Sequence, residues 1–382
     1  MTTKTNKIWG IGTFNGSVKM LVMGISFFWA IFYNSIGFTG GQIGIILASS
    51  TVVGLLTLIP SGFFNDRIRS KNLVSIALLM IATQYIGISQ NHEFPVVLMF
   101  ALIGGFGYNL YLTSADSIFY KTIGQTKERA KSIGIYQGIN YLSLGLGMMA
   151  SGYVLSTNIP FENLIFYFGL GFLVLAVVSR ILPSTITTKF NLLNYKKDLF
   201  NSRILIFLIV IFMFAIHFGA EQTSYGLFLE KYLGLTGLQI GLYMGTAVFL
   251  MGIWSVIFAR LLKKIQARSL LYTGLIASSL GHLLMVNSDP VYSFIFRVFH
   301  EAGDAAMFVF FAYGISTMFD TKRIGGNNSI FLLFITLGGT LGALIFGPMG
   351  EKYGYDVPFT VTGYVLFTAL LIAIIFHKKI KV

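Results

Sequence analysis

Apolar residues dominate this chain in long runs separated by short polar segments, and the pattern predicts helices that cross a membrane. A run of about 20 residues lets a helix span ~30 Å of hydrocarbon. Backbone groups in lipid must be paired within their own segment, which favours helices over open strands. We therefore predict an all-α polytopic membrane protein with twelve transmembrane helices. The predicted spans are residues 20–38, 42–64, 72–90, 95–118, 132–156, 161–183, 204–227, 237–259, 269–287, 291–317, 328–349 and 357–377.

The second half of the chain repeats the first. Residues 38–47 (FTGGQIGIIL) return as residues 235–244 (LTGLQIGLYM), with five identities at a constant offset of 197. A repeat of about half the chain, in a very apolar protein, is typical of transporters built from two homologous bundles.

A long polar segment, residues 184–203, separates six predicted spans from six. We expect an N-terminal six-helix bundle over residues 1–183, a cytoplasmic linker over residues 184–203 and a C-terminal six-helix bundle over residues 204–382. Because six is even, the two bundles have the same orientation and are pseudo-symmetric about an axis along the membrane normal.

Composition agrees with a membrane protein, since 55% of the residues are hydrophobic, 11% are charged and the mean hydropathy is +0.76. The net charge is +13, and an N-terminus inside the cell places 24 of the 27 Lys and Arg on the cytoplasmic side. Lys4, Lys7, Lys19 and Lys121 belong to this group. The positive-inside rule then places both termini in the cytoplasm of a multi-pass inner-membrane protein. The excess basicity predicts contact with anionic lipid headgroups, and no nucleic acid is expected as a partner.

The sequence offers little chemistry for an enzyme. It has no cysteine, which excludes disulfides, thiol catalysis and cysteine metal sites. No nucleophile–base pairing or metal motif stands out, and no cofactor is expected. The first apolar run lacks a small-residue cleavage site, so we expect it to remain as the first helix. A membrane sensor or scaffold without transport stays an alternative, although no soluble domain or long tail supports it.

Residues 62–71 (GFFNDRIRSK), after the second predicted span, carry a family signature. They resemble the loop G-x-x-x-D-R-x-G-R-R/K of the major facilitator superfamily, with matches at Gly62, Asp66, Arg67 and Lys71 and departures at two other positions. Together with the twelve spans, the repeat and the polar break, the chain is similar to members of this family over essentially its whole length.

The resemblance favours a secondary active transporter that works by alternating access, and we expect a monomer that uses the proton gradient as its driving force. It also implies a cytoplasmic gate formed by Gly62, Asp66, Arg67 and Lys71, whose charges hold the halves together while the cavity is open to the outside. An acid near a helix N-terminus and basic neighbours is stabilised by contacts that must break to change state. The second-half copy of the loop has Lys263 where the acid would be, so the repeat is asymmetric here.

A second motif of the family marks many antiporters in their fifth helix and is written G-x-x-x-G-P-x-x-G-G. The aligned residues here are Ser143, Gly147, Met148, Ser151 and Gly152. The proline is missing and two glycines are serine, which weakens the prediction of an antiporter. Export of drugs or lipid-like amphiphiles remains the main alternative within transport, favoured by an aromatic content of 15%.

Ionisable residues inside the predicted spans form the most specific candidate site. Each costs about 2.5–3.5 kcal/mol at the membrane centre and therefore calls for a partner or a function. In the tenth span the spacing i, i+3, i+4, i+7 places four of them on one helix face, and the seventh span adds two at i, i+4. The residues are Arg297, His300, Glu301 and Asp304 in the tenth span and His217 and Glu221 in the seventh.

Two interpretations of this group remain open. In one, Arg297 neutralises the acids and the group is a fixed ion-pair network. In the other, a carboxyl group takes a proton from outside and releases it when Arg297 or the substrate moves close, with Glu301 and Asp304 as leading candidates and Glu221 third. An imidazole beside a carboxylate suits proton transfer near neutral pH, similar in type to the Arg/His/Glu relay of sugar–proton symporters in the family.

Imidazole and carboxylate groups could also bind a transition metal. His217, Glu221 and His300 come from two different helices, so spacing along the chain cannot test the geometry. Metal transport is therefore a lesser alternative, and no metal site is predicted.

The N-terminal spans carry almost no charge. Asp116, near the inner end of the fourth span, is expected at the cavity mouth or against a loop. Many family members have an arginine in this span, but the offset of 197 places Phe100 opposite Arg297. An amide-rich, aromatic wall facing a charged one suits a small-molecule substrate that is polar or amphiphilic. The candidates for this wall, or for contacts between helices, are Trp29, Tyr33, Asn34, Tyr108, Asn109, Gln137, Asn140 and Tyr141.

Overall fold

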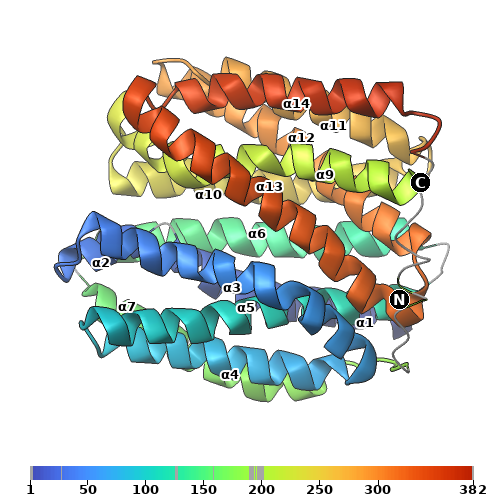
Figure 1. Ribbon diagram of the computed structural model, residues 1–382, viewed down its shortest axis with the longest axis horizontal. Coiled ribbons are helices and arrows are strands. Elements are labelled where there is room, and N and C mark those ends of the chain that lie inside the picture. The colour runs from blue at the N-terminus through green and yellow to red at the C-terminus, as the bar shows by residue number, and fades with distance from the viewer. Residues whose placement is uncertain are drawn as a thin grey trace.

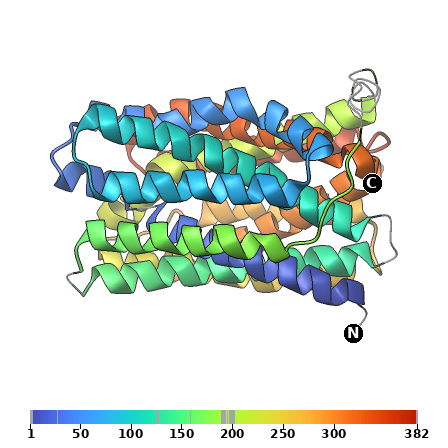
Figure 2. The ribbon, with the colours of Figure 1, turned by 90° about the horizontal axis from the view of Figure 1, so that it is seen from below.

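The computed structural model describes residues 3–26, 28–124, 128–157, 159–188, 193, 195 and 202–380, and long helices account for most of them. Figures 1 and 2 show these helices side by side along the length of the molecule. The first group of helices is α1 (Thr3–Ser26), α2 (Trp29–Ser35), α3 (Gly40–Arg67), α4 (Ser70–Ser89), α5 (Phe94–Ile123), α6 (Arg129–Leu155) and α7 (Phe161–Val178), followed by a 3-10 turn (Ser179–Ile181). The second group is α9 (Ser202–Ala220), two π-helical turns (Glu221–Tyr225 and Phe228–Tyr232), α10 (Gly237–Leu261), α11 (Ala267–Leu284), α12 (Pro290–Met318), a 3-10 turn (Thr321–Arg323), α13 (Ile324–Tyr353) and α14 (Val357–Ile375).

Helices lie at every predicted apolar run, and within the described part of the chain the predicted all-α fold is confirmed. Within the described residues, eight helices are long and apolar enough to cross a membrane by length and composition. The other long helices, α1, α6, α11 and α12, carry more polar residues. Of the predicted linker, residues 189–192, 194 and 196–201 lie outside the described part of the chain.

The first predicted span begins too late. α1 begins at Thr3, not near residue 20, so Asn15 and Lys19 lie inside the helix. Lys19 is therefore not a charge that precedes the membrane, because it lines a cavity between helices. The hydropathy pattern misplaces this span because polar side chains that face other helices avoid the lipid they would otherwise disfavour.

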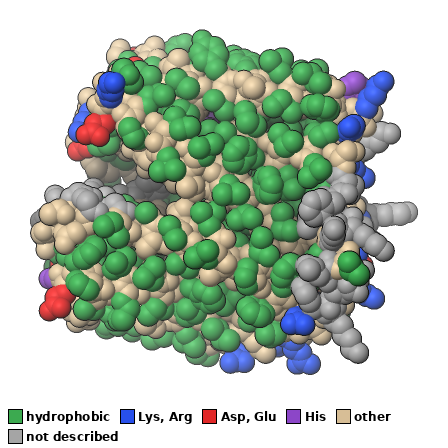
Figure 3. All heavy atoms as spheres, in the orientation of Figure 1, with side chains coloured by type: hydrophobic (Ala, Val, Ile, Leu, Met, Phe, Trp, Pro, Cys, Tyr) green, Lys and Arg blue, Asp and Glu red, His purple; other side chains and the backbone are tan. Residues whose placement is uncertain are grey.

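The two groups of helices occupy opposite halves of the molecule in Figure 1, where α6 lies next to α10 and α13 crosses toward α3. Both ends of the chain lie at the same end of the molecule. Lys and Arg side chains gather there in Figure 3, while apolar side chains cover the surface between the two ends. We call this end the basic end. The surface in Figure 3 is hollowed between the two halves at the opposite end.

Two identical capping boxes explain the repeated segment of the sequence. Thr39 caps α3, where its hydroxyl accepts from the backbone N of Gln42 and its own N donates to the Gln42 side chain at 2.9 Å. Thr236 and Gln239 cap α10 in the same way, with the latter bond at 2.8 Å. Each box satisfies two backbone donors that a helix start leaves unpaired. The repeat thus preserves the start of the second helix in each half.

Glycines allow α6 and α10 to approach closely. A Cβ atom on Gly145 would lie 2.5 Å from the carbonyl oxygen of Gly245, and one on Gly252 would lie 2.8 Å from that of Gly138. Such small residues bring helix backbones into contact within membranes. This contact joins the two halves of the molecule.

Candidate functional site

Ionisable side chains from α9, α11, α12 and the turn after α9 converge inside the second half. All are buried except that of Glu221, which is 18% exposed. The group, which we call the polar cluster, consists of His217, Glu221, His282, Arg297, His300, Glu301 and Asp304. The structure thus brings together the residues singled out in the seventh and tenth predicted spans and adds one histidine from a third helix.

Arg297 connects two glutamates from different helices. Its Nη1 donates to Glu221 Oε1, and its Nη2 donates to Glu301 Oε1 at 2.5 Å. The guanidinium also lies over the ring of Tyr225, 4.5 Å from the ring centroid. Glu221 begins a π-helical turn, an irregularity that is frequent at functional sites. The guanidinium of Arg297 therefore pairs with both carboxyl groups.

His300 faces oxygen atoms with both ring nitrogens. Its Nδ1 lies 2.9 Å from the carbonyl oxygen of Ser278, while its Nε2 lies 3.2 Å from Glu221 Oε1 and 3.6 Å from Asp304 Oδ2. A carbonyl oxygen only accepts, so Nδ1 carries a hydrogen. The contacts at Nε2 are then attractive only when a further proton lies on the ring or on a carboxyl group. His300 Nε2 thus lies between two acids without a hydrogen bond to either in this arrangement.

The other two histidines have a similar arrangement. His217 Nε2 lies 3.2 Å from Asp304 Oδ2, and His282 Nε2 lies 3.5 Å from Glu221 Oε1. The rings of His282 and His300 are stacked, with centroids 4.0 Å apart. Glu221 and Asp304 therefore each contact two imidazoles, whereas Glu301 pairs with Arg297.

The polar cluster contains more negative than positive fixed charge. Three carboxyl groups face one guanidinium, which leaves two negative charges when every acid is ionised and every imidazole is neutral. An uncompensated buried charge is strongly destabilising. Protons shared between imidazoles and carboxylates, or a bound cation, remove the imbalance.

Four members of the polar cluster could hold a metal ion. The donor atoms of His217, Glu221, His282 and His300 all lie within 4.8 Å of one another. In a tetrahedral site with bonds of about 2.1 Å, donor atoms are about 3.4 Å apart, so this group would have to contract. The Glu221 oxygen is also bound by Arg297. Protons can bind without contraction of the group and without loss of the bond between Arg297 and Glu221. The geometry therefore favours protons over a metal ion.

A cavity of about 150 Å³ lies between α1, α5 and α6 of the first half and α12 and α13 of the second. Asp116 Oδ2 accepts from Asn328 of α13 at 3.0 Å. This acid therefore faces the other half rather than a loop, because α13 crosses in front of α5. The polar residues of the lining include Asn15, Lys19, Asp116, Tyr136, Gln137, Asn140, Tyr141 and Asn328.

Three of the predicted wall residues, Gln137, Asn140 and Tyr141, line this cavity. The ring of Tyr141 lies 5.8 Å from that of Phe308 on α12. The wall of α6 thus reaches the helix that carries four members of the polar cluster.

The other predicted wall residues lie elsewhere or are not described. Trp29 stacks on Tyr33, with ring centroids 5.5 Å apart, within an aromatic group of the first half. Asn109 donates to a backbone carbonyl of its own helix at 2.8 Å, and Tyr108 packs against the apolar core. The side chain of Asn34 lies outside the described part of the chain. Among the predicted wall residues that the structure describes, those of α6 line the cavity and those of α2 and α5 do not.

Asp66 binds both halves of the molecule at the basic end. It accepts from the backbone N of Gly325 at 3.1 Å and of Gly326 at 2.7 Å, at the start of α13. Lys121 Nζ lies 2.9 Å from Asp66 Oδ1, and the hydroxyl of Tyr195 lies 3.1 Å from Oδ2. A helix N-terminus stabilises an anion in this position. These four donors satisfy a carboxylate with no exposed surface.

The other predicted gate residues surround this contact. A Cβ atom on Gly62 would lie 2.7 Å from the carbonyl oxygen of Gly325, so the glycine allows α3 and α13 to touch. Lys71 Nζ lies 3.4 Å from the carbonyl oxygen of Arg180, within the first half. Arg67 is exposed.

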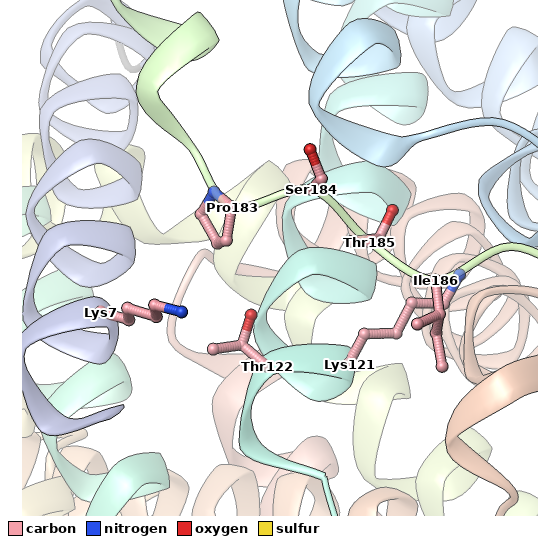
Figure 4. Close-up of a pocket in the computed structure, with 7 residues that line it drawn as sticks. All are labelled: Lys7, Lys121, Thr122, Pro183, Ser184, Thr185 and Ile186. Carbon is pink, nitrogen blue, oxygen red and sulfur yellow. The ribbon is translucent and has the colours of Figure 1, made fainter. Parts of the chain in front are cut away.

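A second cavity, of about 320 Å³, lies beside the gate. Figure 4 shows Lys7 of α1 and Thr122 of α5 facing residues 183–186, the start of the polar segment between the halves. Thr185 Oγ1 accepts from the backbone N of Ser70 at 2.9 Å and ties this segment to α4. The lining residues are Lys7, Lys121, Thr122, Pro183, Ser184, Thr185 and Ile186.

Sequence reasoning misses three residues of these sites. His282 stands alone in its predicted span, although an ionisable residue at membrane depth is itself a functional signal. Lys19 and Lys121 fall near predicted span ends, where basic residues normally signal topology. The structure instead places Lys19 in the cavity and Lys121 against Asp66.

Two halves of long apolar helices with a cavity between them are typical of membrane transporters. The sequence model of the Major Facilitator Superfamily matches residues 12–281 and 207–381, and the chain belongs to this family. The resemblance seen in the signature loop is thereby confirmed. Members of the family are transporters rather than enzymes, and the protein is an integral, multi-pass membrane protein.

Proteins with similar sequence or fold are also transporters. Multidrug resistance protein 2 of Bacillus subtilis (strain 168) is 20% identical over 362 residues, which cover 89% of this chain and 88% of that protein. The human organic anion transporter MFSD10 has a TM-score of 0.76 at 14% identity, covering 97% of this chain and 100% of that chain. The proton:xylose symporter XylE from E. coli has a TM-score of 0.74 at 12% identity, covering 98% and 96%. These structures share the fold of this chain.

Proposed function

We propose that this protein is a proton-coupled secondary transporter that moves a small polar or amphiphilic organic solute across the inner membrane. Residues 1–183 and 204–382 are the two bundles, which rock about the cavity between them in a monomer. By the positive-inside rule the basic end faces the cytoplasm, where it contacts anionic lipid headgroups.

The charge imbalance of the polar cluster is the observation that carries proton coupling. Two negative charges in excess of the guanidinium need compensation, and imidazole–carboxylate contacts provide places for protons. Arg297 supplies a cation that binds Glu301 whenever this acid is ionised. Protonation of Glu301 removes its charge and weakens this bond, so a proton on this acid loosens its hold on Arg297.

The polar cluster and the cavity share one helix. Asp304 and Phe308 are one turn apart on α12, and Phe308 lines the cavity. A proton bound by Asp304 and a solute held against Phe308 therefore act on the same element. Such a shared element is the physical requirement for coupling two binding events.

The contacts of the gate support the interpretation that this conformation is open to the outside of the cell. Asp66 holds α3 against α13 at the basic end, and the surface is hollowed between the halves at the opposite end in Figure 3. With the basic end in the cytoplasm, the described arrangement is closed to the inside. The cycle then requires the Asp66 contacts to break.

Proteoliposomes that enclose a pH-sensitive dye test this function. Sugars, nucleosides, amino acids and carboxylates are added outside in turn, and proton influx is recorded for each. We expect one solute class to carry protons inward, and an imposed inward pH gradient to drive its accumulation. Glu301→Gln should abolish gradient-driven uptake, whereas exchange of the solute at equal concentrations, which needs no net proton movement, should persist.

Glu230→Gln is the matched control, because Glu230 is an exposed acid of the same half. It should behave as the unaltered protein does. Solute transport that ignores an imposed pH gradient and survives Glu301→Gln would show that the polar cluster is a fixed ion-pair network.

Export of amphiphilic drugs is a second candidate. It is favoured by the similarity to Multidrug resistance protein 2 and by the phenylalanines in the cavity lining, Phe308, Phe311 and Phe331. In the same proteoliposomes an exporter would exchange a lipophilic dye for protons in the opposite direction. Dye movement opposite to the proton gradient, with no response to polar solutes, would select this candidate.

A further inference from the structure

Lys19 differs from the other interior cations in its contacts. Lys121 and Arg297 are bound to carboxylates at 2.9 Å and 2.5 Å. Lys19 is half-buried in the cavity lining, and within the described residues no carboxylate lies within ion-pair distance of it and no hydrogen bond is formed by its ammonium. A cation at this depth calls for an anionic partner.

Asp116 does not fill this role. It lines the same cavity, but its Oδ2 accepts from Asn328 at 3.0 Å and its Oδ1 from the hydroxyl of Tyr136 at 3.5 Å. Lys19 acts on this carboxylate only through space. The ammonium donors of Lys19 therefore remain available to a ligand in the cavity.

The rest of the lining indicates the shape and chemistry of that ligand. Phe308 and Phe311 of α12 and Phe331 of α13 give the second half's lining an apolar character, whereas Lys19 and Gln137 belong to the lining from the first half. The volume of about 150 Å³ matches that of an apolar protein cavity of about 150 Å³ that binds benzene. A cationic donor and aromatic side chains in one cavity fit a small organic anion with an apolar body.

We propose that Lys19 is the anion-binding residue of the transport cavity and that the solute is a small organic anion, such as a carboxylate, whose apolar body lies against the phenylalanines of α12 and α13. This inference rests on the proposed function, in which the cavity is the transport site. It narrows the solute from polar or amphiphilic molecules in general to anions.

A charge series of equal size tests the proposal. Benzoate, benzamide and benzylamine each contain one benzene ring. Benzoate is negatively charged, benzamide is neutral and benzylamine is positively charged. Their dissociation constants are measured by ligand-dependent thermal stabilisation of the purified protein. We expect benzoate to bind about tenfold or more tightly than benzamide, because a charge-assisted hydrogen bond is stronger than a neutral one. Benzylamine should bind most weakly.

Three variants test whether Lys19 is the source of the preference for benzoate. Lys19→Gln should remove the preference for benzoate and leave benzamide binding within about twofold of the unaltered value. Lys19→Arg should keep the preference. Lys131→Gln is the matched control, because Lys131 is an exposed lysine of α6, a helix that also lines the cavity, and it should change neither constant.

Equal or tighter binding of benzamide or benzylamine by the unaltered protein overturns the proposal, and so does a preference that persists in Lys19→Gln. Absence of stabilisation by benzoate and by its longer homologue phenylacetate overturns it too. If Lys19→Gln does not fold, the three dissociation constants measured on the unaltered protein still test the proposal. Proton-driven uptake of a neutral or cationic solute would leave the proposed function standing and remove this inference. Anion binding that depends on Lys19, without proton-driven uptake, would leave this inference standing and remove the proposed function.

Discussion

Asp66 and Lys121 form an ion pair with Oδ1 and Nζ 2.9 Å apart, and their side chains are only 1% and 2% exposed. Both residues belong to the first half, yet the same carboxylate accepts from two backbone amides of α13 in the second half. Breaking a buried ion pair by removing one partner costs about 3–5 kcal/mol. The contact between the halves at the basic end therefore depends on a carboxylate whose charge is held in place by Lys121.

Asp66→Asn should slow transport by about tenfold or more without unfolding the protein. The amide oxygen of asparagine can still accept from α13, but the attraction to Lys121 is lost, so the closed arrangement becomes less stable. The measurement is solute uptake by proteoliposomes, together with thermal unfolding of the purified variant. Asp320→Asn is the control, because Asp320 is 43% exposed and pairs with Arg323 of its own turn. Normal turnover in Asp66→Asn would remove the gating role.

Gly62→Ala should separate α3 from α13. The added methyl group would lie 2.7 Å from the carbonyl oxygen of Gly325, closer than such a contact allows, so the basic end should open. Leu332 lines the cavity, and a cysteine introduced there should react faster with a maleimide added at the basic end. The chain has no cysteine of its own, so the signal comes from this position alone.

Gly226→Ala is the matched control for this change. Gly226 has helical backbone angles, with φ −57°, and no atom lies within 4 Å of a Cβ atom placed on it. Labelling at residue 332 should not change, and stability should stay equal or rise by up to about 1 kcal/mol. Equal labelling in Gly62→Ala and Gly226→Ala would contradict the close contact of α3 and α13.

Arg297→Gln should destabilise the protein by about 3–5 kcal/mol, because Glu221 and Glu301 then lose their shared cation. The effect of Glu301→Gln should depend on this background. With Arg297 present it removes an ion pair at 2.5 Å, and with Arg297 absent it removes an unpaired charge and should restore stability. Thermal unfolding of the two single variants and the double variant measures this coupling. If the losses of stability in the two single variants add up in the double variant, the ion pair between Arg297 and Glu301 contributes no coupling energy.

Thr39→Ala and Thr236→Ala should each cost about 0.5–2 kcal/mol, since each removes a helix cap. The two losses should be similar because the capping boxes have the same bonds. Thr368→Ala is the control, because this exposed threonine donates to a carbonyl of its own helix and caps nothing. Thermal unfolding of the three variants compares them. A loss at only one of the two caps would show that the repeat has kept its sequence without keeping its energetic role.

Most of the fold could be predicted because lipid imposes one rule on every span. Long apolar runs must be helices, and the helices lie where those runs lie. The exception is α1, whose polar residues Asn15 and Lys19 interrupt the run. Hydropathy along the chain does not record whether a side chain faces lipid or another helix, so the beginning of this helix could not be placed.

The candidate site was predictable only where its residues share a helix. The spacing of Arg297, His300, Glu301 and Asp304 places them on one face by helical geometry alone. His282 joins them only because α11 packs against α12, and the contact of Asp66 with α13 depends on how two halves of the chain meet. Such tertiary contacts leave no periodic signal in one sequence.

The glycine contact between α6 and α10 has a mechanical consequence. Backbone meets backbone at Gly145 and Gly245 and again at Gly138 and Gly252, while Met149 and Leu142 of α6 pack against the glycines of α10. A larger residue at any of these glycines would push the two helices apart, and the two halves of the molecule with them. The spacing of the two halves is therefore set by the width of two backbones along this line, and polar bonds from α13 to Asp66 and Asp116 hold the halves together beside it.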